Sequence, residues 1–191
     1  MFKPWIGQEY DTTRLLLLGE SAYSWWEADE QRHPSPEHSI DMVEWAVDNF
    51  PHCGRFFAML CRALANQQEP NKERLRSVWD RVGFTNYVST TVLEGTRARP
   101  SPAQWREANK SFLPDLSEFF KVLPRRIIVL GKTMWGNMPD DTEVYPADDV
   151  QGYRVADNIV MCHAVDHPAG GLSWRRLAGV IHFTYQRELR A

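Results

Sequence analysis

Short apolar runs alternate along this 191-residue chain with longer stretches whose apolar residues recur at helical spacing. Four of the runs predict strands, at residues 15–18, 84–88, 127–130 and 159–162. The longer stretches predict helices at residues 40–49, 54–66, 73–80, 101–121 and 173–189, and a short helix is expected after Gly131. Strands that alternate with helices are typical of a three-layer α/β/α sandwich around a mostly parallel central sheet. The pattern therefore predicts an α/β fold.

Local signals mark helix starts and loops. Ser39 is placed to cap the helix at 40–49, and Ser101 followed by proline opens the helix at 101–121. Residues 26–39 and 139–152 are polar or acidic and contain prolines, which predicts two long surface loops. No repeat or linker divides the sequence, so we expect a single domain over residues 1–191.

The composition is that of an ordinary soluble globular protein, with 43% apolar and 25% charged residues. No stretch approaches the roughly 20 apolar residues that span a bilayer, so no contact with a membrane is expected. The first residues lack a signal-peptide pattern, and the three cysteines lack the paired spacing of a metal site. We therefore expect a cytoplasmic protein with reduced thiols.

The net charge of −3 gives no global support for binding to nucleic acid. Arginines nevertheless cluster in the sequence, at Arg97 and Arg99, at Arg125 and Arg126, and at Arg175 and Arg176. A phosphate-binding surface needs only a local basic patch. Paired arginines are also common on solvated surfaces, and the sequence leaves both interpretations open.

Three motifs that could bind a cofactor or a metal ion are incomplete. Gly131-Lys132-Thr133 follows a strand but lacks the first glycine of a P-loop, and Leu18-Gly19-Glu20 lacks the further glycines of a dinucleotide-binding motif. His163 and His167 are four residues apart across a strand end, where this spacing does not bring two ligands together. We therefore expect neither a cofactor nor a metal ion.

Two polar loops follow predicted strands near the two ends of the chain. The first is Gly19-Glu20-Ser21-Ala22-Tyr23, and the second is His167-Pro168-Ala169-Gly170-Gly171-Leu172-Ser173. In open α/β sheets, ligands bind in the crevice outside the carboxyl ends of the strands. If both loops lie there, Glu20, Ser21, Tyr23 and His167 converge on one pocket.

Ser21 and His167 would also fit a serine esterase. A serine on a strand-to-loop turn, together with a histidine late in the chain, can carry out acyl transfer. Tyr23, however, replaces the second glycine of a nucleophile elbow, and the adjacent Asp166 is poorly placed to orient His167. The esterase stays a lesser alternative.

Together with the strand at 84–88, the two loops resemble motifs of the uracil-DNA glycosylase superfamily. The loop at 19–23 resembles the first motif, which begins with Gly-Gln or Gly-Glu, and the loop at 167–173 resembles the last motif, which is His-Pro-Ser-Pro-Leu-Ser in some branches. The motifs follow the family order over most of the chain. The resemblance implies the fold of this superfamily and a DNA glycosylase. Such an enzyme would hydrolyse the N-glycosidic bond of a deaminated or modified pyrimidine flipped out of single- or double-stranded DNA, without a cofactor.

The resemblance also implies how the base is held. Asn86 would read the base edge, since an amide presents a donor and an acceptor in one plane. Tyr23 would stand against C5 of the base, and His167 would donate to the base oxygen that gains negative charge as the bond breaks. A phenylalanine would stack on the base, and the sequence leaves open whether it is Phe50, Phe56 or Phe57.

Contacts with DNA are implied for the end of the last motif. Leu172 would enter the duplex as an apolar wedge, or it would simply anchor the last helix. Ser173, at the start of the last helix, would hold a backbone phosphate with Arg175 or Arg176.

Departures from the family bear on the chemistry. Ser21 stands where the most active branch has the aspartate that positions the attacking water, so Glu20 or Ser21 would have to hold this water. The last loop is one residue longer than usual and has Ala169 in place of a serine, and three cysteines exclude the branch with a four-cysteine iron–sulfur cluster. The main alternative is therefore a non-catalytic module that binds nucleic acid or a nucleotide on the same fold.

Overall fold

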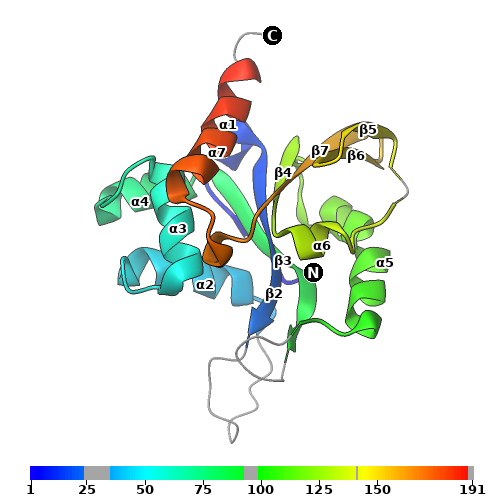
Figure 1. Ribbon diagram of the computed structural model, residues 1–191, viewed down its shortest axis with the longest axis horizontal. Coiled ribbons are helices and arrows are strands. Elements are labelled where there is room, and N and C mark those ends of the chain that lie inside the picture. The colour runs from blue at the N-terminus through cyan, green and yellow to red at the C-terminus, as the bar shows by residue number, and fades with distance from the viewer. Residues whose placement is uncertain (24–34, 93–98, 141, 189–191) are drawn as a thin grey trace, which may run out of the picture.

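The computed structural model describes residues 1–23, 35–92, 99–140 and 142–188 (Figure 1). These residues form one seven-stranded sheet in the order β1-β3-β2-β4-β7-β6-β5. The strands are β1 (Trp5–Ile6), β2 (Leu15–Tyr23), β3 (Val82–Val92), β4 (Arg126–Leu130), β5 (Val144–Ala147), β6 (Val150–Val155) and β7 (Asn158–Val165). The helices are α1 (Tyr10–Thr13), α2 (His38–Asn49), α3 (Gly54–Ala65), α4 (Lys72–Trp79), α5 (Pro102–Phe119), α6 (Lys132–Trp135), the 3₁₀ helix η1 (Pro168–Gly170) and α7 (Trp174–Glu188).

The sheet is mixed. Strands β3, β2, β4 and β7 are neighbours and run parallel. At one edge β1 pairs antiparallel with β3, and at the other β6 and β5 continue antiparallel beyond β7. The predicted α/β fold is confirmed, but the expectation of a mostly parallel sheet holds only for the four central strands.

Strands β1, β5 and β6, at the edges of the sheet and next to one of them, were not predicted because they have no continuous apolar run. β1 is only two residues long. The loop expected at 139–152 contains β5 and the start of β6, where Pro146 and Gly152 interrupt the apolar pattern. A strand that is covered on one face alone does not need the uninterrupted apolar sequence of a central parallel strand.

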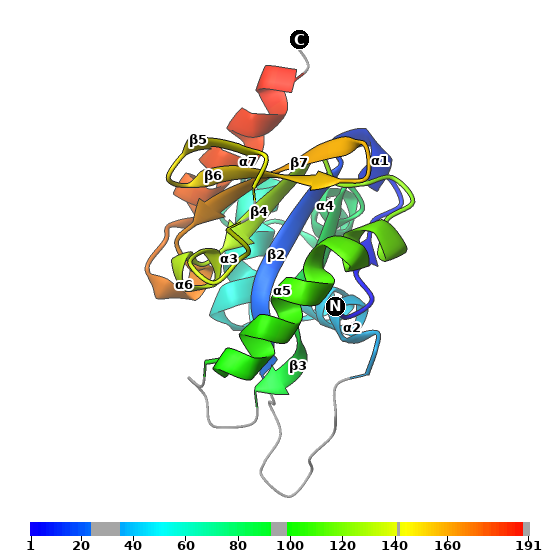
Figure 2. The same ribbon diagram turned by 90° about the vertical axis from the view of Figure 1, so that its right-hand side faces the viewer.

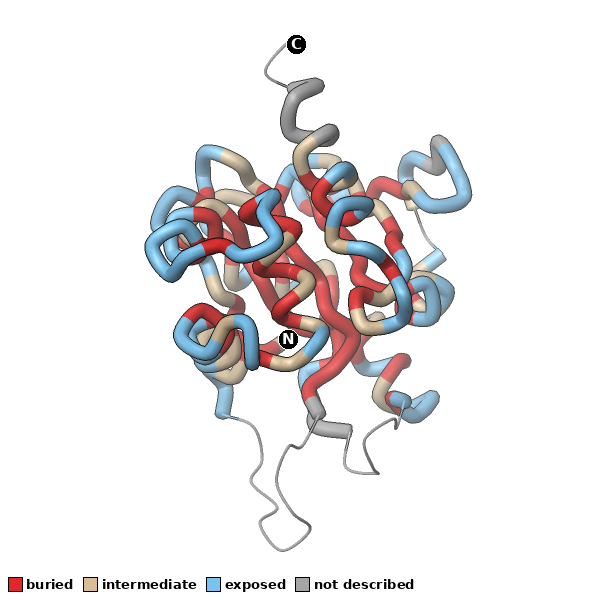
Figure 3. Tube along the Cα trace, turned by 60° about the vertical axis from the view of Figure 1, so that its left-hand side comes forward, coloured by how far each residue is buried: buried red, intermediate tan, exposed pale blue. Residues whose placement is uncertain are grey.

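Alternate residues of the central strands face two separate hydrophobic cores. Leu15 and Leu17 of β2 pack with residues of α2, α3, α4 and α7, whereas Leu16 and Leu18 pack on the other face with residues of α5 and α6. Figures 1 and 2 show these two groups of helices on opposite faces of the sheet. The middle of the sheet is therefore buried from both sides, as Figure 3 shows in red.

The predicted helices lie within two residues of their expected bounds. Ser101 caps α5 as predicted, in a capping box with Gln104. Ser39 does not cap α2, since Glu37 is the N-cap residue and the buried Ser39 hydroxyl lies 3.3 Å from the hydroxyl of Thr85. Of the loop expected at 26–39, residues 26–34 lie outside the described part of the chain. Among the described helices, none combines the length and the apolar character that crossing a membrane requires.

The order of the parallel strands reverses at β2. From β2 the chain passes through α2, α3 and α4 on one face to reach β3, and from β3 it returns through α5 on the other face to reach β4 on the far side of β2. The helices that follow β2 and β4 thus lie on opposite faces of the sheet. A crevice for a ligand is expected at such a point, outside the carboxyl ends of the strands.

Candidate functional site

Two adjoining cavities lie at the carboxyl ends of the central strands. The apolar pocket has a volume of about 490 Å³, and its lining includes Glu20, Ser21, Phe56, Phe57, Asn86 and His167. The basic groove has a volume of about 500 Å³, and its lining includes Arg99, Lys132, Thr133, Asp166, Ser173 and Arg176. Both Arg99 and His167 line both cavities, so the pocket and the groove meet at these two side chains. Four residues singled out in the sequence, Glu20, Ser21, Asn86 and His167, therefore line one pocket.

Asn86 is positioned by the parallel pairing of β2 with β3. The register places it opposite Gly19, and its side chain lines the apolar pocket while the residue is 6% exposed. A Cβ atom at residue 19 would lie 2.4 Å from Asn86 Oδ1. The loop predicted at 19–23 is in fact the second half of β2, and residue 19 has to be a glycine so that the Asn86 amide can lie against this strand.

His167 is held by its own loop and by Phe56. The backbone N–H of Ala169 donates to His167 Nδ1 at 3.2 Å, so the neutral ring carries its proton on Nε2. The Phe56 ring lies 5.4 Å from the His167 ring, centroid to centroid, at an interplanar angle of 35°. Burial, and after it the positive charge of Arg99, lowers the pKa of His167 below its usual value. His167 is therefore neutral at pH 7 and offers Nε2–H as a donor.

Glu20 lies in the second half of β2 and forms an ion pair with Arg99, and both residues line the pocket. Its Oε2 accepts a hydrogen bond from Arg99 Nη1 at 2.7 Å. The Glu20 side chain is 2% exposed, whereas that of Arg99 is 57% exposed. The negative partner is thus fixed inside the protein and the positive partner is in contact with solvent.

Ser21 is buried next to Glu20. Its Oγ has no hydrogen-bond partner among the residues that the structure describes. A buried hydroxyl without a partner on the wall of a cavity is available to a ligand or a water molecule.

The geometry does not support the esterase. A catalytic triad needs a hydrogen bond from the serine to the histidine and a proton on the other ring nitrogen, directed at a carboxylate. In this structure the second nitrogen of His167 accepts from Ala169 instead, and the Asp166 carboxylate lies 3.9 Å from Arg176.

The residues expected to contact DNA are at the start of α7. Ser173 Oγ accepts from the backbone N–H of Arg176 at 3.2 Å, so Ser173 caps α7 at the wall of the basic groove. Arg176 lines the same groove. The guanidinium of Arg175 instead lies over the Trp174 ring, 4.5 Å from its centroid.

Leu172 does not project as a wedge. It is 6% exposed and belongs to the hydrophobic core that includes residues of α3 and α7. To enter a duplex, the side chain would have to leave this core at the cost of its buried apolar surface. In this structure Leu172 anchors the start of α7.

Tyr23 is the last residue of β2, and its backbone pairs with Val92. Its side chain lies outside the described part of the structure, so the expected contact with C5 of a base stays a prediction.

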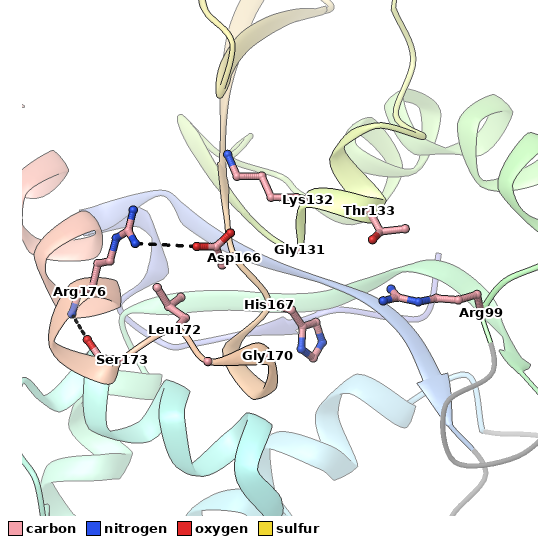
Figure 4. A pocket seen from close by; sticks show the side chains of 11 residues that line it. Arg99, Gly131, Lys132, Thr133, Asp166, His167, Gly170, Leu172, Ser173 and Arg176 are labelled. Atoms are coloured by element: carbon pink, nitrogen blue, oxygen red, sulfur yellow. Dashed lines mark hydrogen bonds and ion pairs between the residues drawn. The ribbon is translucent and has the colours of Figure 1, made fainter.

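Three positive side chains line the basic groove, and the sequence motifs identified Arg176 but not Lys132 as a residue of the site (Figure 4). Lys132 pairs with Asp149, Arg176 with Asp166 and Arg99 with Glu20. Lys132 and Thr133 belong to the segment that lacks the first glycine of a P-loop. They nevertheless line the groove, because they follow the end of β4. The nearness of Lys132, Arg99 and Arg176 depends on the strand order, which no local motif encodes.

The choice among the three phenylalanines is narrowed by the fold. Phe56 and Phe57 line the apolar pocket, and Phe56 also contacts the His167 ring. Phe50 lies under the Arg62 guanidinium, 5.4 Å from it. Phe56 is therefore best placed to contact a planar ligand.

Comparisons with known proteins leave the family open. No family model and no curated protein matches the chain. In the described part of the chain, no three His, Cys, Asp or Glu side chains are grouped so that they could hold a metal ion. An assignment of function therefore depends on the geometry of the two cavities.

Proposed function

We propose that the protein is a monofunctional DNA glycosylase with a fold of the uracil-DNA glycosylase type. It would hydrolyse the N-glycosidic bond of a deaminated or modified pyrimidine that is flipped out of DNA, in the cytoplasm and without a cofactor. The observation that carries this proposal is the convergence of three residues on one pocket: Glu20 from β2, Asn86 from β3 and His167, which follows β7.

The pocket suits a planar base. Phe56 and Phe57 supply apolar surface, and Asn86 supplies an amide with one donor and one acceptor. An amide of this kind pairs with the O4 and N3–H edge of uracil. A glycosylase has to read a flipped base in this way, because the base leaves its partner and its stack before cleavage.

His167 would stabilise the departing base. Cleavage of the bond leaves negative charge on the base and positive charge on the sugar, and a preorganised donor aimed at the base oxygen stabilises that charge as it develops. The contact from Ala169 fixes the proton of the neutral ring on Nε2, which makes this nitrogen the donor. Because the pKa of His167 is lowered, the donor stays neutral over the physiological pH range.

Glu20 and Ser21 would hold the attacking water. Both line the pocket, and the Ser21 hydroxyl has no hydrogen-bond partner among the described residues. A carboxylate accepts a proton from water more readily than a hydroxyl does, so Glu20 would activate the water and Ser21 would orient it.

The basic groove would hold the DNA backbone next to the flipped nucleotide. Arg99, Lys132 and Arg176 place three cations along it, and phosphate contacts of this kind fix the register of a protein on DNA. The groove meets the pocket at Arg99 and His167, which is the arrangement that a base still attached to its sugar and phosphate requires.

A panel of oligonucleotides tests the proposal. Single- and double-stranded DNA with one uracil, one hypoxanthine or one bulky 5-substituted cytosine is incubated with the protein, and both free base and abasic sites are measured. Release of uracil or of the substituted cytosine is expected, and the hypoxanthine substrate, which carries a purine, is the control. Any ester hydrolysis that Ser21→Ala abolishes would instead favour the esterase. Absence of free base from every substrate would contradict the proposal.

The ion pair between Glu20 and Arg99 favours a second candidate, the non-catalytic binding module. A carboxylate that is neutralised by a guanidinium at 2.7 Å is a weaker base than a free one. Tight binding of the same oligonucleotides without release of any base would favour this candidate.

A further inference from the structure

Arg99 has the most unusual position of the three groove cations. Its guanidinium is the only one of the three that lines both the groove and the pocket in the described structure, and it is 57% exposed. It lies just before α5, whose start is fixed by the capping box at Ser101. Its backbone is thus held on one side by a capped helix while its side chain reaches Glu20.

The acidic partners of the three cations differ in how far their side chains are exposed to solvent. Asp149 and Asp166, which pair with Lys132 and Arg176, have side chains that are 58% and 51% exposed. Glu20 is 2% exposed. If a phosphate takes Lys132 or Arg176 from its partner, water can solvate the aspartate that is left. If a phosphate takes Arg99, the Glu20 carboxylate that loses this contact is inside the protein. A new hydrogen-bond donor in the pocket then stabilises it strongly.

We propose that Arg99 is a positioning residue that couples the two cavities by exchanging anionic partners. In the free protein it holds Glu20. A phosphate of the DNA backbone in the groove draws the guanidinium away, and the Glu20 carboxylate then turns to the attacking water. The last step rests on the proposed function, whereas the exchange of Glu20 for a phosphate does not.

The exchange has a consequence for catalysis. Glu20 would lose its contact with Arg99 only when a phosphate is in place, so that water is activated beside a bound nucleotide and not in the empty pocket. The carboxylate would accept its hydrogen bond from Arg99 in the free protein and from water in the complex.

Phosphate affinity of the free protein tests the exchange. Inorganic phosphate and an unmodified thymidine tetranucleotide are titrated calorimetrically into the wild type and into Glu20→Gln, Asp149→Asn, Arg99→Gln and Arg99→Lys. Glu20→Gln removes the competitor for Arg99 and should raise the affinity at least fivefold. Asp149→Asn makes the same change of charge at an exposed pair and should raise it less than twofold. Arg99→Gln should lower the affinity about tenfold, and Arg99→Lys should restore part of it.

Equal increases of phosphate affinity in Glu20→Gln and Asp149→Asn would show only the effect of one more net positive charge, and would overturn the proposal. Unchanged affinity in Arg99→Gln would overturn it as well. Circular dichroism checks the fold of each variant, and Glu20→Asp, whose shorter side chain draws back from Arg99, should shift the affinity in the same direction as Glu20→Gln. The tetranucleotide separates a site for the DNA backbone, which binds it more tightly than inorganic phosphate, from a site for the free ion.

The two proposals fail separately. If base release is absent but Glu20→Gln tightens phosphate binding selectively, the glycosylase is excluded and the exchange at Arg99 stands. If base is released but the affinities of the Glu20 and Asp149 variants change equally, the enzyme stands and the coupling is excluded.

Discussion

The apolar pocket and the basic groove adjoin, yet they hold their charges in opposite ways. The aspartates that pair with the groove cations, Asp149 and Asp166, are more than half exposed, and exposed pairs of this kind contribute about 0–1 kcal/mol. In the pocket, Glu20 is almost fully buried and His167 is kept neutral by its surroundings. The groove cations can therefore exchange their anionic partners at little cost in free energy, whereas a change of charge at Glu20 or His167 costs much more. In the proposed glycosylase, this difference would assign binding of the phosphates to the groove and chemistry to the pocket.

The largest expected effect is that of His167→Ala. If Nε2–H stabilises the departing base, its loss should lower kcat for base release by roughly 10²–10³, the range for removal of one preorganised donor. DNA affinity should change far less. The matched control is His163→Ala, since His163 is a partly buried histidine of β7 outside the linings of both cavities. Equal losses of kcat in the two variants would contradict the role of His167.

Gly19→Ala should be the next most damaging. The new Cβ would lie 2.4 Å from Asn86 Oδ1, so the amide has to leave its place. We expect base release to fall at least tenfold and thermal unfolding to occur at a lower temperature. Gly136→Ala is the control, because its Cβ would meet nothing closer than 3.7 Å. A fully active Gly19→Ala variant would exclude Asn86 as the base-reading residue.

Neutralising the groove should weaken affinity more than catalysis. Lys132→Gln and Arg176→Gln should each lower DNA affinity several-fold, and each should reduce the slope of log affinity against log salt concentration by about one. Fluorescence anisotropy over a series of salt concentrations measures both. Lys110→Gln removes an exposed lysine of α5 that pairs with Glu107 and should leave the slope unchanged. If the Lys132 and Lys110 variants have the same slope, the groove does not bind the backbone.

The smallest effect concerns stability at low pH. Burial is the main cause that lowers the pKa of His38, His163 and His167 in the folded state. As the pH falls below about 6.5, the ordinary histidine value, the unfolded chain binds more protons than the folded one and the free energy of unfolding decreases. Urea unfolding at pH 7.5 and pH 5.5 should show this decrease, and it should be smaller in His167→Ala than in the wild type. An equal pH dependence in both would mean that His167 is not buried enough to resist protonation.

The sequence predicts the centre of this molecule better than its edges. The apolar runs of β2, β4 and β7 identify the buried strands, because a strand covered on both faces has to be apolar throughout. The capping box at Ser101 likewise marks the start of α5. Strands β1, β5 and β6, which lie at the two edges of the sheet and next to one of them, have no such constraint. Ser39 was predicted to cap α2 because its buried contact with Thr85 cannot be inferred from the local sequence.

In the candidate site too, residues marked by local sequence were predicted, and contacts between distant residues were not. Glu20, Ser21 and His167 were predicted to meet because each follows an apolar strand run, and Asn86 was added through the family resemblance. The pairing of Arg99 with Glu20 and the place of Lys132 were not predicted, since both depend on residues far apart in the sequence. Leu172 was assigned to the surface by its motif, whereas the packing of α3 against α7 buries it.

Base release under single-turnover conditions tests the central claim most directly. Protein in excess is mixed with each modified oligonucleotide, and free base and abasic DNA are quantified over time by mass spectrometry. The account predicts that one substrate yields base and abasic site in equal amounts with the wild type, at a rate at least 100-fold above that of His167→Ala. Binding of all the oligonucleotides without release of base, or equal rates for the two proteins, would contradict it.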